Sequence, residues 1–376
     1  MKILHAVLSQ GFYGSERYCA ELAATQARDG HDVEIVVHGA WSDCAREMRQ
    51  AVALANTVGA GTLRLVTIPG WMPAFLHRPI ARIALRRFKP DIVHTHLNPA
   101  ARRIGREAQK LHIPHVSTLH LTYAKREVGD CDGLICIAGW QLDTLKDFGG
   151  EVVVAHNWIP RTVFDALLET TVQQVGELRQ SWNAGPETAV FGSAGRLVPE
   201  KGVDRLVEIF RRLFPDGDEA VRLVIVGDGA DRGQIERLAQ SDPRIIFAGV
   251  QHNVAPYYRA FDIYVSPARF EPFGLSILEA MAAGCPLVLT RSEGPSEFVA
   301  DPRVLWADPQ DNAKLAEQLV ASLDLAGHRL TYEMKSFSPE RATEQITAFY
   351  RRVMKKLTAS ETLPRETANG TASPPP

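Results

Sequence analysis

Short apolar runs rich in β-branched residues alternate with helical patterns along most of this chain. Runs with so little polar alternation are typical of strands that are buried on both faces of a sheet. Helices between such strands return the chain to the same end of the sheet, so the strands run parallel. The pattern occurs in two sets, and the expected strands begin at residues 2, 32, 63, 91, 115, 133 and 151, then at 189, 221, 244, 263 and 286.

A more polar stretch without a strand pattern, residues 161–188, separates the two sets. We therefore expect an α/β protein with two doubly wound, Rossmann-like domains that face a central cleft. The expected boundaries are 1–165 for the N-terminal domain, 166–335 for the C-terminal domain, 336–358 for a helix that crosses back to the first domain, and 359–376 for a Pro-rich, disordered tail.

The overall composition is that of an ordinary globular protein, with 45% hydrophobic and 23% charged residues. The net charge of −2 argues against a nucleic-acid partner. The five cysteines fit neither a disulfide framework nor a zinc site and are typical of a reducing compartment. No apolar run reaches the ~18 residues of a membrane span, and the apolar start is too short for a signal peptide. We expect a cytoplasmic protein.

The stretch RFEPFGLSILEAMAAGCPLVLT, residues 269–290, combines a helix start with two carboxylates. Between residues 273 and 289 the one charged side chain is Glu279, so this helix is expected to be buried all round. A buried carboxylate needs hydrogen-bond donors, which come either from a basic residue of the protein or from the hydroxyls of a ligand. The sequence leaves both sources open.

Groups suited to a ligand surround the start of this helix. Pro272 and Gly274 stand where the helix begins, and Glu271 lies at its mouth. The free N–H groups of Phe273, Gly274 and Leu275 would form an anion site. Two carboxylates and an anion site suit a sugar, a phosphate and a ribose.

The segment GSAGRLVPEKGVDRLVE places two cations after another strand. Arg196 ends the strand and Lys201 precedes a helix, at the edge where a doubly wound fold binds its ligand. Two fixed cations and a helix N-terminus would stabilise a departing nucleoside diphosphate without a metal ion.

Two motifs carry less weight. LVIVGDGADRG places Gly227, Gly229 and Gly233 after a strand, but the last gap is one residue too long for a dinucleotide site. A tight strand-to-helix turn and a looser role near a nucleotide both remain open. Asp130 and Asp132 precede a strand, where turn residues are expected, so the pair does not indicate a metal site.

The first half contains a pair of histidines on one strand and a segment rich in basic residues. His94 and His96 alternate along one strand and point to one side, where they either line the cleft or form hydrogen bonds in the core. Residues 76–112 hold nine Lys or Arg against two acids, mixed with bulky apolar residues at helical spacing. This basic face, residues 75–110, either lies on an anionic membrane surface or is a solvated helix packed on the sheet.

Several of these segments together resemble a known family. EPFGLSILE resembles the Glu-x7-Glu signature of the family 4 retaining glycosyltransferases, which have the two-domain GT-B fold. GRLVPEKGVDRLVE, LVIVGDGADRGQIE and EAMAAGCPLVLTRSEGPSEFV are similar to other segments of that family, in the same order. The resemblance is strong over residues 190–300 and weaker over residues 1–160.

The resemblance implies a role for each matching residue on the donor side. Arg196, Lys201 and Gly14, the last in the first loop GFYGSER, would bind the donor diphosphate. Glu271 would act in catalysis by contacting the sugar hydroxyls, with the backbone of Phe273, Gly274 and Leu275 beside sugar and phosphate. Glu279 would hold the ribose, and Val250 would lie near the base.

In this family the first domain usually binds the acceptor, and three departures fall there. His120 stands where the family places a functional histidine, but Leu121 follows it where many members have an acid. Tyr13 takes the place of a glycine in the first loop, and Trp158 takes the place of a glycine in a later turn. These changes bear on the acceptor more than on donor chemistry. The resemblance implies that His120 acts in catalysis by hydrogen-bonding to the donor sugar. His96 and Asn157 are candidates for the acceptor side.

The resemblance implies a retaining glycosyltransferase. It would move a hexose-type sugar from a nucleotide-diphosphate donor to a hydroxyl of a glycan or lipid-linked acceptor, in cell-surface polysaccharide or lipopolysaccharide assembly. The donor is a substrate, and no permanent cofactor or metal is implied. The protein would be cytoplasmic, and peripheral on the inner leaflet if the basic face binds membrane. A GT-B-fold sugar-nucleotide epimerase and a non-catalytic sugar-nucleotide binder remain as alternatives.

Overall fold

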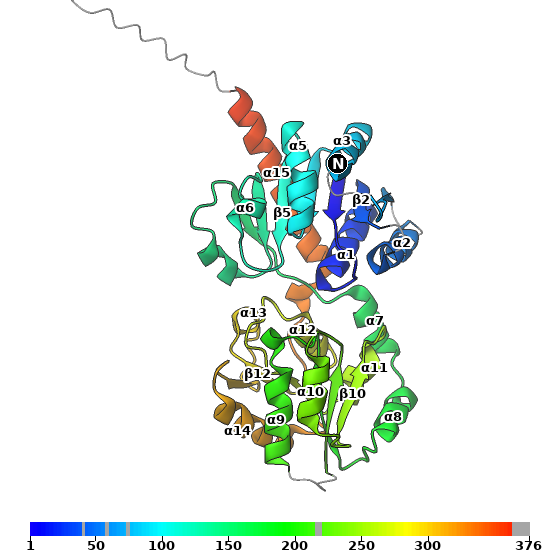
Figure 1. The fold of residues 1–376 in the computed structure, drawn as a ribbon, viewed down its shortest axis with the longest axis vertical. Helices are drawn as coiled ribbons and strands as arrows, with labels where there is room; N and C mark the ends of the chain where they lie inside the picture. Colours follow the sequence, from blue (N-terminus) through cyan, green and yellow to red (C-terminus); the bar gives the residue numbers. More distant parts are fainter. Residues whose placement is uncertain (40–41, 57–59, 73–75, 215–219, 363–376) are drawn as a thin grey trace, which may run out of the picture.

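The computed structural model describes residues 1–39, 42–56, 60–72, 76–214 and 220–362. Within these ranges the strands form two parallel sheets, one in each half of an elongated molecule (Figure 1). The prediction of two doubly wound α/β domains is confirmed. Most of the expected disordered tail, residues 363–376, lies outside the described residues.

The N-terminal sheet has seven strands in the order β3-β2-β1-β4-β5-β6-β7. Their bounds are β1 Lys2–Val7, β2 Asp32–His38, β3 Thr62–Ile68, β4 Ile92–His96, β5 His115–Leu119, β6 Gly133–Cys136 and β7 Glu151–Val154. The helices of this half are α1 Gly14–Arg28, α2 Asp43–Ala55, α3 His77–Phe88, α4 Asn98–Ala100, α5 Arg106–Lys110 and α6 Lys125–Val128, with a 3-10 helix at Gly139–Thr144.

The C-terminal sheet has six strands in the order β10-β9-β8-β11-β12-β13. Their bounds are β8 Ala189–Ala194, β9 Val221–Val226, β10 Ile245–Gly249, β11 Ile263–Ser266, β12 Leu287–Thr290 and β13 Leu305–Ala307. The helices are α9 Val203–Leu213, α10 Arg232–Ala239, α11 Ala255–Ala260, α12 Leu275–Ala282, α13 Glu293–Phe298 and α14 Asn312–Ala321. The edge strand β13 was not expected, because three residues are too few to show a pattern.

Each sheet has one place where the direction of winding reverses. In the N-terminal sheet it lies between β1 and β4, and in the C-terminal sheet between β8 and β11. Loops that leave neighbouring strands in opposite directions open a crevice at the C-terminal ends of those strands, and doubly wound folds bind ligands there. The first loop, Arg196 and Glu271 all follow these strands.

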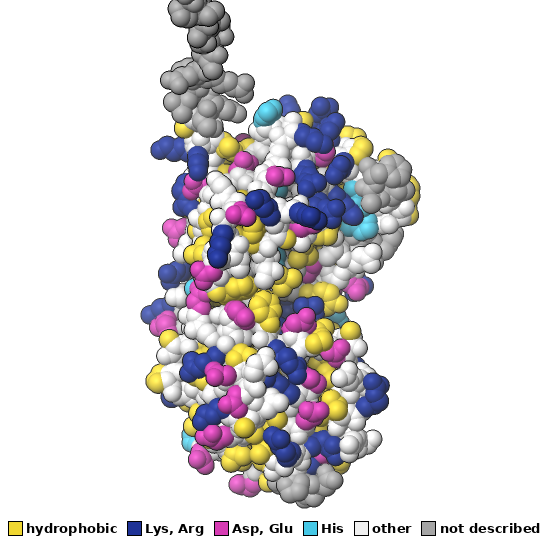
Figure 2. All heavy atoms as spheres, turned by 60° about the vertical axis from the view of Figure 1, so that its left-hand side comes forward, with side chains coloured by type: hydrophobic (Ala, Val, Ile, Leu, Met, Phe, Trp, Pro, Cys, Tyr) yellow, Lys and Arg dark blue, Asp and Glu magenta, His cyan; other side chains and the backbone are white. Residues whose placement is uncertain are grey.

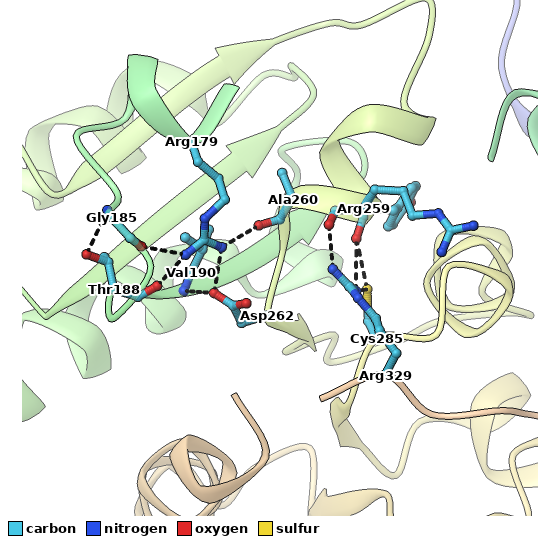
Figure 3. A network of polar contacts seen from close by, with 10 residues as sticks. Arg179, Gly185, Thr188, Val190, Arg259, Ala260, Asp262, Cys285 and Arg329 are labelled. Carbon is cyan, nitrogen blue, oxygen red and sulfur yellow. Dashed lines mark hydrogen bonds and ion pairs between the residues drawn. The ribbon is translucent and has the colours of Figure 1, made fainter. Parts of the chain in front are cut away.

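The polar stretch between the two strand sets forms two helices, α7 Arg161–Glu169 and α8 Val172–Ser181. Arg179 of α8 is hydrogen-bonded to the C-terminal sheet (Figure 3): its guanidinium donates to Asp262 Oδ2 at 2.8 Å and to the Thr188 carbonyl at 2.7 Å. The same Asp262 oxygen accepts from the Val190 N–H at 2.9 Å. Thus α8 is fixed to the second half of the molecule.

The last helix, α15 Pro339–Thr362, runs back along the N-terminal sheet, as its orange and red ribbon shows in Figure 1. A Cβ added to Gly133 of β6 would lie 2.7 Å from the Phe349 ring, so the glycine admits the helix. The Tyr350 hydroxyl lies 2.6 Å from His94 Nδ1 on β4. The C-terminal helix therefore completes the core of the first half.

The two halves also meet through a carboxylate. Glu297 of α13 accepts hydrogen bonds from the Gly139 N–H at 2.7 Å and the Trp140 N–H at 3.1 Å, and contacts His156 Nε2 at 2.8 Å. The indole N–H of Trp140 donates to the Pro272 carbonyl at 2.8 Å. These contacts hold the 3-10 helix of the first half against the loop that carries Glu271.

Candidate active site

A pocket opens at the C-terminal edge of the second sheet, and its lining includes Arg196, Lys201, Glu271, Tyr264 and Ser276. Three of the residues expected to contact a nucleotide sugar therefore share one pocket. Arg196 follows β8 and is exposed, and Glu271 follows β11. Because β8 and β11 are neighbouring strands on either side of the place where winding reverses, the residues that follow them border one crevice.

Lys201 and Glu271 form an ion pair across this pocket. Their side chains are 21% and 11% exposed, so the pair is shielded from water on most sides. The second oxygen of Glu271 accepts from the Phe273 N–H at 3.4 Å. The three backbone N–H groups predicted to be free at this helix start are therefore not all free, since that of Phe273 is directed at Glu271.

The start of α12 allows another group to approach its backbone closely. Gly274 has a φ of 107°, in the left-handed region that favours glycine, and it directly precedes the helix. Gly14, at the start of α1 in the other half, faces it, because a Cβ there would lie 3.2 Å from Leu275 Cδ1. The two helix N-termini consequently meet across the cleft, and both favour an anion between them.

Glu279 is buried within α12, with 7% of the residue exposed. The Tyr258 hydroxyl of α11, a protein group that the sequence did not indicate, donates to Glu279 Oε2 at 2.7 Å. Burial raises the pKa of Glu279, while the Tyr258 hydrogen bond and the positive charge of Arg17 act in the opposite direction. Arg17 belongs to α1, so a cation of the first half acts on a carboxylate of the second.

His120 follows β5 and is half-buried. Burial lowers its pKa to about 3, so its imidazole is neutral. The backbone on either side is held by Gln141, whose side-chain amide donates to the carbonyls of Leu119 at 2.9 Å and Leu121 at 2.6 Å. The neighbouring Trp140 donates to the Pro272 carbonyl of the Glu271 loop, which links the His120 segment to the pocket that holds Lys201 and Glu271.

The remaining candidates lie at different depths. Val250 is 67% exposed just after β10. Asn157 is buried, and its Oδ1 has no hydrogen-bond partner among the described residues. His94 and His96 are fully buried and hydrogen-bonded, so of the two alternatives they occupy the core, and His96 does not reach the cleft directly.

The weaker motifs have structural explanations. A Cβ at Gly227 would lie 1.9 Å from the Gly195 carbonyl oxygen, so this glycine forms a tight turn against the loop before Arg196. Asp132 accepts the His115 N–H at 2.8 Å and caps the start of β5. Neither motif needs a ligand to explain its residues.

Comparison with known proteins gives two family models that match successive parts of the chain. The model described as Glycosyltransferase Family 4 matches residues 12–162. The model described as Glycosyl transferases group 1 matches residues 188–324. The first lies over the N-terminal sheet and the second over the C-terminal sheet.

Curated relatives are similar over part of their length. A GDP-mannose-dependent alpha-mannosyltransferase of Corynebacterium glutamicum is 27% identical over 293 residues, which cover 72% of this chain and 67% of that protein. The lipopolysaccharide core biosynthesis glycosyltransferase LpsE of Rhizobium meliloti is 34% identical over 171 residues, covering 44% of this chain and 49% of LpsE.

Solved structures share the whole architecture. A glycosyltransferase from Rickettsia africae superposes with a TM-score of 0.75 at 16% identity, covering 94% of this chain and 98% of that one. Anabaena HepE in complex with UDP-glucose superposes with a TM-score of 0.69 at 18% identity, covering 96% and 99%. These likenesses confirm the expected GT-B fold.

Proposed function

Because this chain belongs to the family 4 glycosyltransferases, we propose that it transfers a sugar from a nucleotide-diphosphate donor to a hydroxyl acceptor, with retention of the anomeric configuration. The observation that carries this proposal is the pocket in which Arg196, Lys201 and Glu271 converge, with Gly14 packed against the facing helix start. The acceptor would be a glycan or a lipid-linked saccharide of the cell surface, in keeping with the mannosyltransferase and LpsE relatives.

In this proposal the fixed positive groups act on the leaving diphosphate. As the bond between the anomeric carbon and the phosphate oxygen breaks, negative charge grows on that oxygen. Arg196, Lys201 and the N-terminus of α12 lie where they would stabilise it. The same oxygen then takes the proton of the acceptor hydroxyl, which attacks from the same face of the sugar. This leaving group needs no metal ion in the proposed mechanism.

The remaining groups would position the two substrates. Glu271 would hold the sugar hydroxyls once the diphosphate draws Lys201 away from their ion pair. Glu279, with one oxygen bonded to Tyr258, would accept from a ribose hydroxyl, and the exposed Val250 would lie against the base. His120 would hydrogen-bond to a hydroxyl of the donor sugar during catalysis, and on the acceptor side Asn157 would offer its side-chain oxygen.

Donor turnover tests this proposal. Purified protein would be incubated with GDP-mannose and UDP-glucose, the donors in the relatives' names, with and without a glycan and lipid extract. Acceptor-dependent release of nucleoside diphosphate is expected. Conversion of the donor without acceptor would instead indicate an epimerase, and binding without conversion a non-catalytic protein. Glu271→Gln should lower kcat by about 100-fold or more, and full activity of that variant would contradict the assigned role.

We propose further that the basic face binds an anionic membrane and so brings the enzyme to a lipid-linked acceptor. Among the described residues no helix is both long and apolar enough to cross a membrane. Figure 2 shows Lys and Arg side chains gathered on one side of the N-terminal half. On α3, Ile83 is 66% exposed beside the exposed Arg86 and Arg87, and a mixture of apolar and basic groups suits the interface.

Co-sedimentation with vesicles tests the membrane proposal. Binding is expected to vesicles that contain phosphatidylglycerol and not to pure phosphatidylcholine. Ile83→Glu should weaken it, whereas Val320→Glu, a matched change at a 48% exposed valine of α14, should not. Equal binding of all three proteins would contradict the proposal.

A further inference from the structure

We propose that Gln26, deep in the N-terminal half, determines which ring nitrogen of His120 carries the proton. The two residues are joined through the side chains of His5 and His96. The inference rests on the proposed function, in which His120 binds a sugar hydroxyl. It makes Gln26 a positioning residue that acts on His120 from a distance, through two intervening imidazoles.

The sheet brings these side chains to one face. His5 lies on β1, His96 on β4, and His120 one residue beyond β5, and these three strands are neighbours in the sheet. In the parallel register His5 pairs with His94, and His96 pairs with Thr118. Because side chains alternate along a strand, residues 5, 94, 96, 118 and 120 all point to the same side. On that side helix α1 supplies Gln26, which contacts His5, and helix α15 supplies Tyr350, which contacts His94.

Hydrogen bonds connect the side chains in series. His120 Nε2 lies 3.5 Å from His96 Nδ1, and His96 Nε2 lies 3.0 Å from His5 Nδ1. His5 Nε2 lies 2.7 Å from the side-chain oxygen of Gln26. The ring of Tyr18 packs edge-on against His120 at 5.1 Å and against His96 at 5.6 Å between centroids, which fixes both ring planes.

All three imidazoles are neutral. Burial lowers the pKa of His5 to about 4 and that of His120 to about 3, and it holds the pKa of His96 well below its usual value. A neutral imidazole has one N–H, which donates, and one bare nitrogen, which accepts. Each ring can therefore donate to only one of its two neighbours. The position of the proton on the first ring thus determines the position of the proton on every later ring in the series.

Gln26 determines the position of the proton on the first ring, that of His5. Its amide oxygen can only accept, so His5 must carry its proton on Nε2 and leave Nδ1 bare. His96 must then donate from Nε2 to His5, which leaves its Nδ1 bare. His120 in turn must donate from Nε2 to His96. Its Nδ1, for which no partner exists among the described residues, is left as an acceptor for a sugar hydroxyl.

The C-terminal helix contacts the Gln26 amide. Its NH₂ group donates to the Tyr350 hydroxyl at 3.4 Å while its oxygen faces His5. In the proposed series the Tyr350 hydroxyl, 2.6 Å from His94 Nδ1, would donate to that nitrogen, and His94 Nε2 would donate to the Thr118 hydroxyl at 2.7 Å. Every ring nitrogen of these buried histidines thus has a consistent partner.

The same histidines also suggest a different ligand. Ring nitrogens of His5, His94 and His96 lie within 4.8 Å of one another, a spacing that suits a metal ion. However, all six of their ring nitrogens already belong to the hydrogen bonds above. A metal ion would have to break those bonds, including the one that orients His120, so we favour the hydrogen-bonded series.

Long-range proton–nitrogen NMR of protein labelled with ¹⁵N-histidine tests the proposal directly, because it distinguishes Nδ1–H from Nε2–H imidazoles. Signals would be assigned by single His→Gln variants. His5, His96 and His120 should all be neutral Nε2–H tautomers in the wild-type protein. An Nδ1–H tautomer at His120, or a divalent metal bound in one-to-one ratio by the purified protein, would overturn the proposal.

Two variants extend the test to turnover. Gln26→Met removes the acceptor with little change in volume, and Tyr350→Phe removes the hydroxyl that orients it. Each should shift the His120 signals and lower kcat on the order of tenfold, with the donor KM unchanged. The control is Thr347→Val, which removes a buried hydroxyl of α15 that has no hydrogen-bond partner within the part of the chain that the structure describes. A loss of kcat as large in the control as in Tyr350→Phe would show that packing of α15, not the tautomer, is responsible.

This inference and the proposed function can fail separately. The tautomers are read in wild-type protein without any substrate. If His120 is an Nε2–H tautomer and no donor is turned over, the proposed function fails alone. If a donor is turned over and His120 is an Nδ1–H tautomer, the inference fails alone.

Discussion

Lys201 and Glu271 form an ion pair that the proposed function gives a role in donor binding. Each charge is paired with the other, and both side chains are largely shielded from water. In that proposal a diphosphate that binds Lys201 would release Glu271 for the sugar hydroxyls, so the ion pair would couple the two parts of the donor. Such an exchange keeps either charge from being left unpaired in a partly buried site.

Lys201→Met should therefore affect both binding and turnover. We expect the donor KM to rise and kcat to fall, each by about tenfold or more, because a charge on the diphosphate loses its partner. Steady-state kinetics of nucleoside diphosphate release measures both. Glu200→Gln, an exposed neighbour in the same turn, serves as the control and should behave as wild type. Unchanged kinetics for Lys201→Met would remove this residue from the diphosphate site.

The positions of single site residues were predictable where the residue directly follows a recognisable strand. Arg196, Lys201 and Glu271 follow strands that are evident as apolar runs, so their convergence follows from the fold. The partner of Glu279 was not predictable, because Tyr258 lies on a separate short helix in a stretch with several aromatic residues. Nor could the sequence connect Gln26 to His120, since each hydrogen bond between them depends on strand register and on the position of α1.

Helices and strands also differ in how well the sequence predicts them. Long apolar strands and helices were recognisable, whereas β13 has only three residues and α7 and α8 lie in a polar stretch. The second of these helices is held to the sheet by Arg179, whose guanidinium also donates to the carbonyls of Ala260 at 3.1 Å and Gly185 at 3.0 Å (Figure 3). The hydrogen bonds of Arg179 depend on the positions of backbone carbonyls that are distant in the sequence, and no local sequence pattern predicts those positions.

Arg179→Met should destabilise the protein. The change leaves Asp262, which is 9% exposed, without its cation and leaves several carbonyls without a donor. We expect a loss of about 2–4 kcal/mol in the free energy of unfolding, measured by urea denaturation. The exposed Arg212 provides the matched control, and Arg212→Met should change the free energy by less than about 0.5 kcal/mol. Equal stability of the two variants would contradict the role given to Arg179.

The histidine-bearing strands predict a dependence of stability on pH. Burial lowers the pKa of His5 from 6.5 to about 4, and that of His115 and His120 from 6.5 to about 3. Below 6.5 the unfolded chain therefore binds protons that the folded chain does not. The free energy of unfolding should be unaffected by these groups above about pH 7 and should fall as the pH decreases from about 6.5 towards 4. Urea midpoints that stay constant across this window would contradict the prediction.

At the scale of the whole molecule, Glu297 joins α13 of the second half to residues of the first half. Glu297→Ala removes the acceptor of the Gly139 and Trp140 N–H groups. We expect the donor-free protein to open, with a larger radius of gyration by small-angle X-ray scattering and a lower kcat. Glu293→Ala, at an exposed position of the same helix, is the control. If Glu297→Ala and wild type scatter identically, this contact does not hold the cleft closed.

The chain passes between the two halves twice, once before α7 and once before α15. The two passages are adjacent, since the Ile159 N–H donates to the Phe337 carbonyl at 3.2 Å. Two joined passages can bend but resist rotation about their own length. The two halves would then open and close by the same hinge motion in each cycle. Residues on opposite sides of the cleft would return to the same relative positions after every turnover.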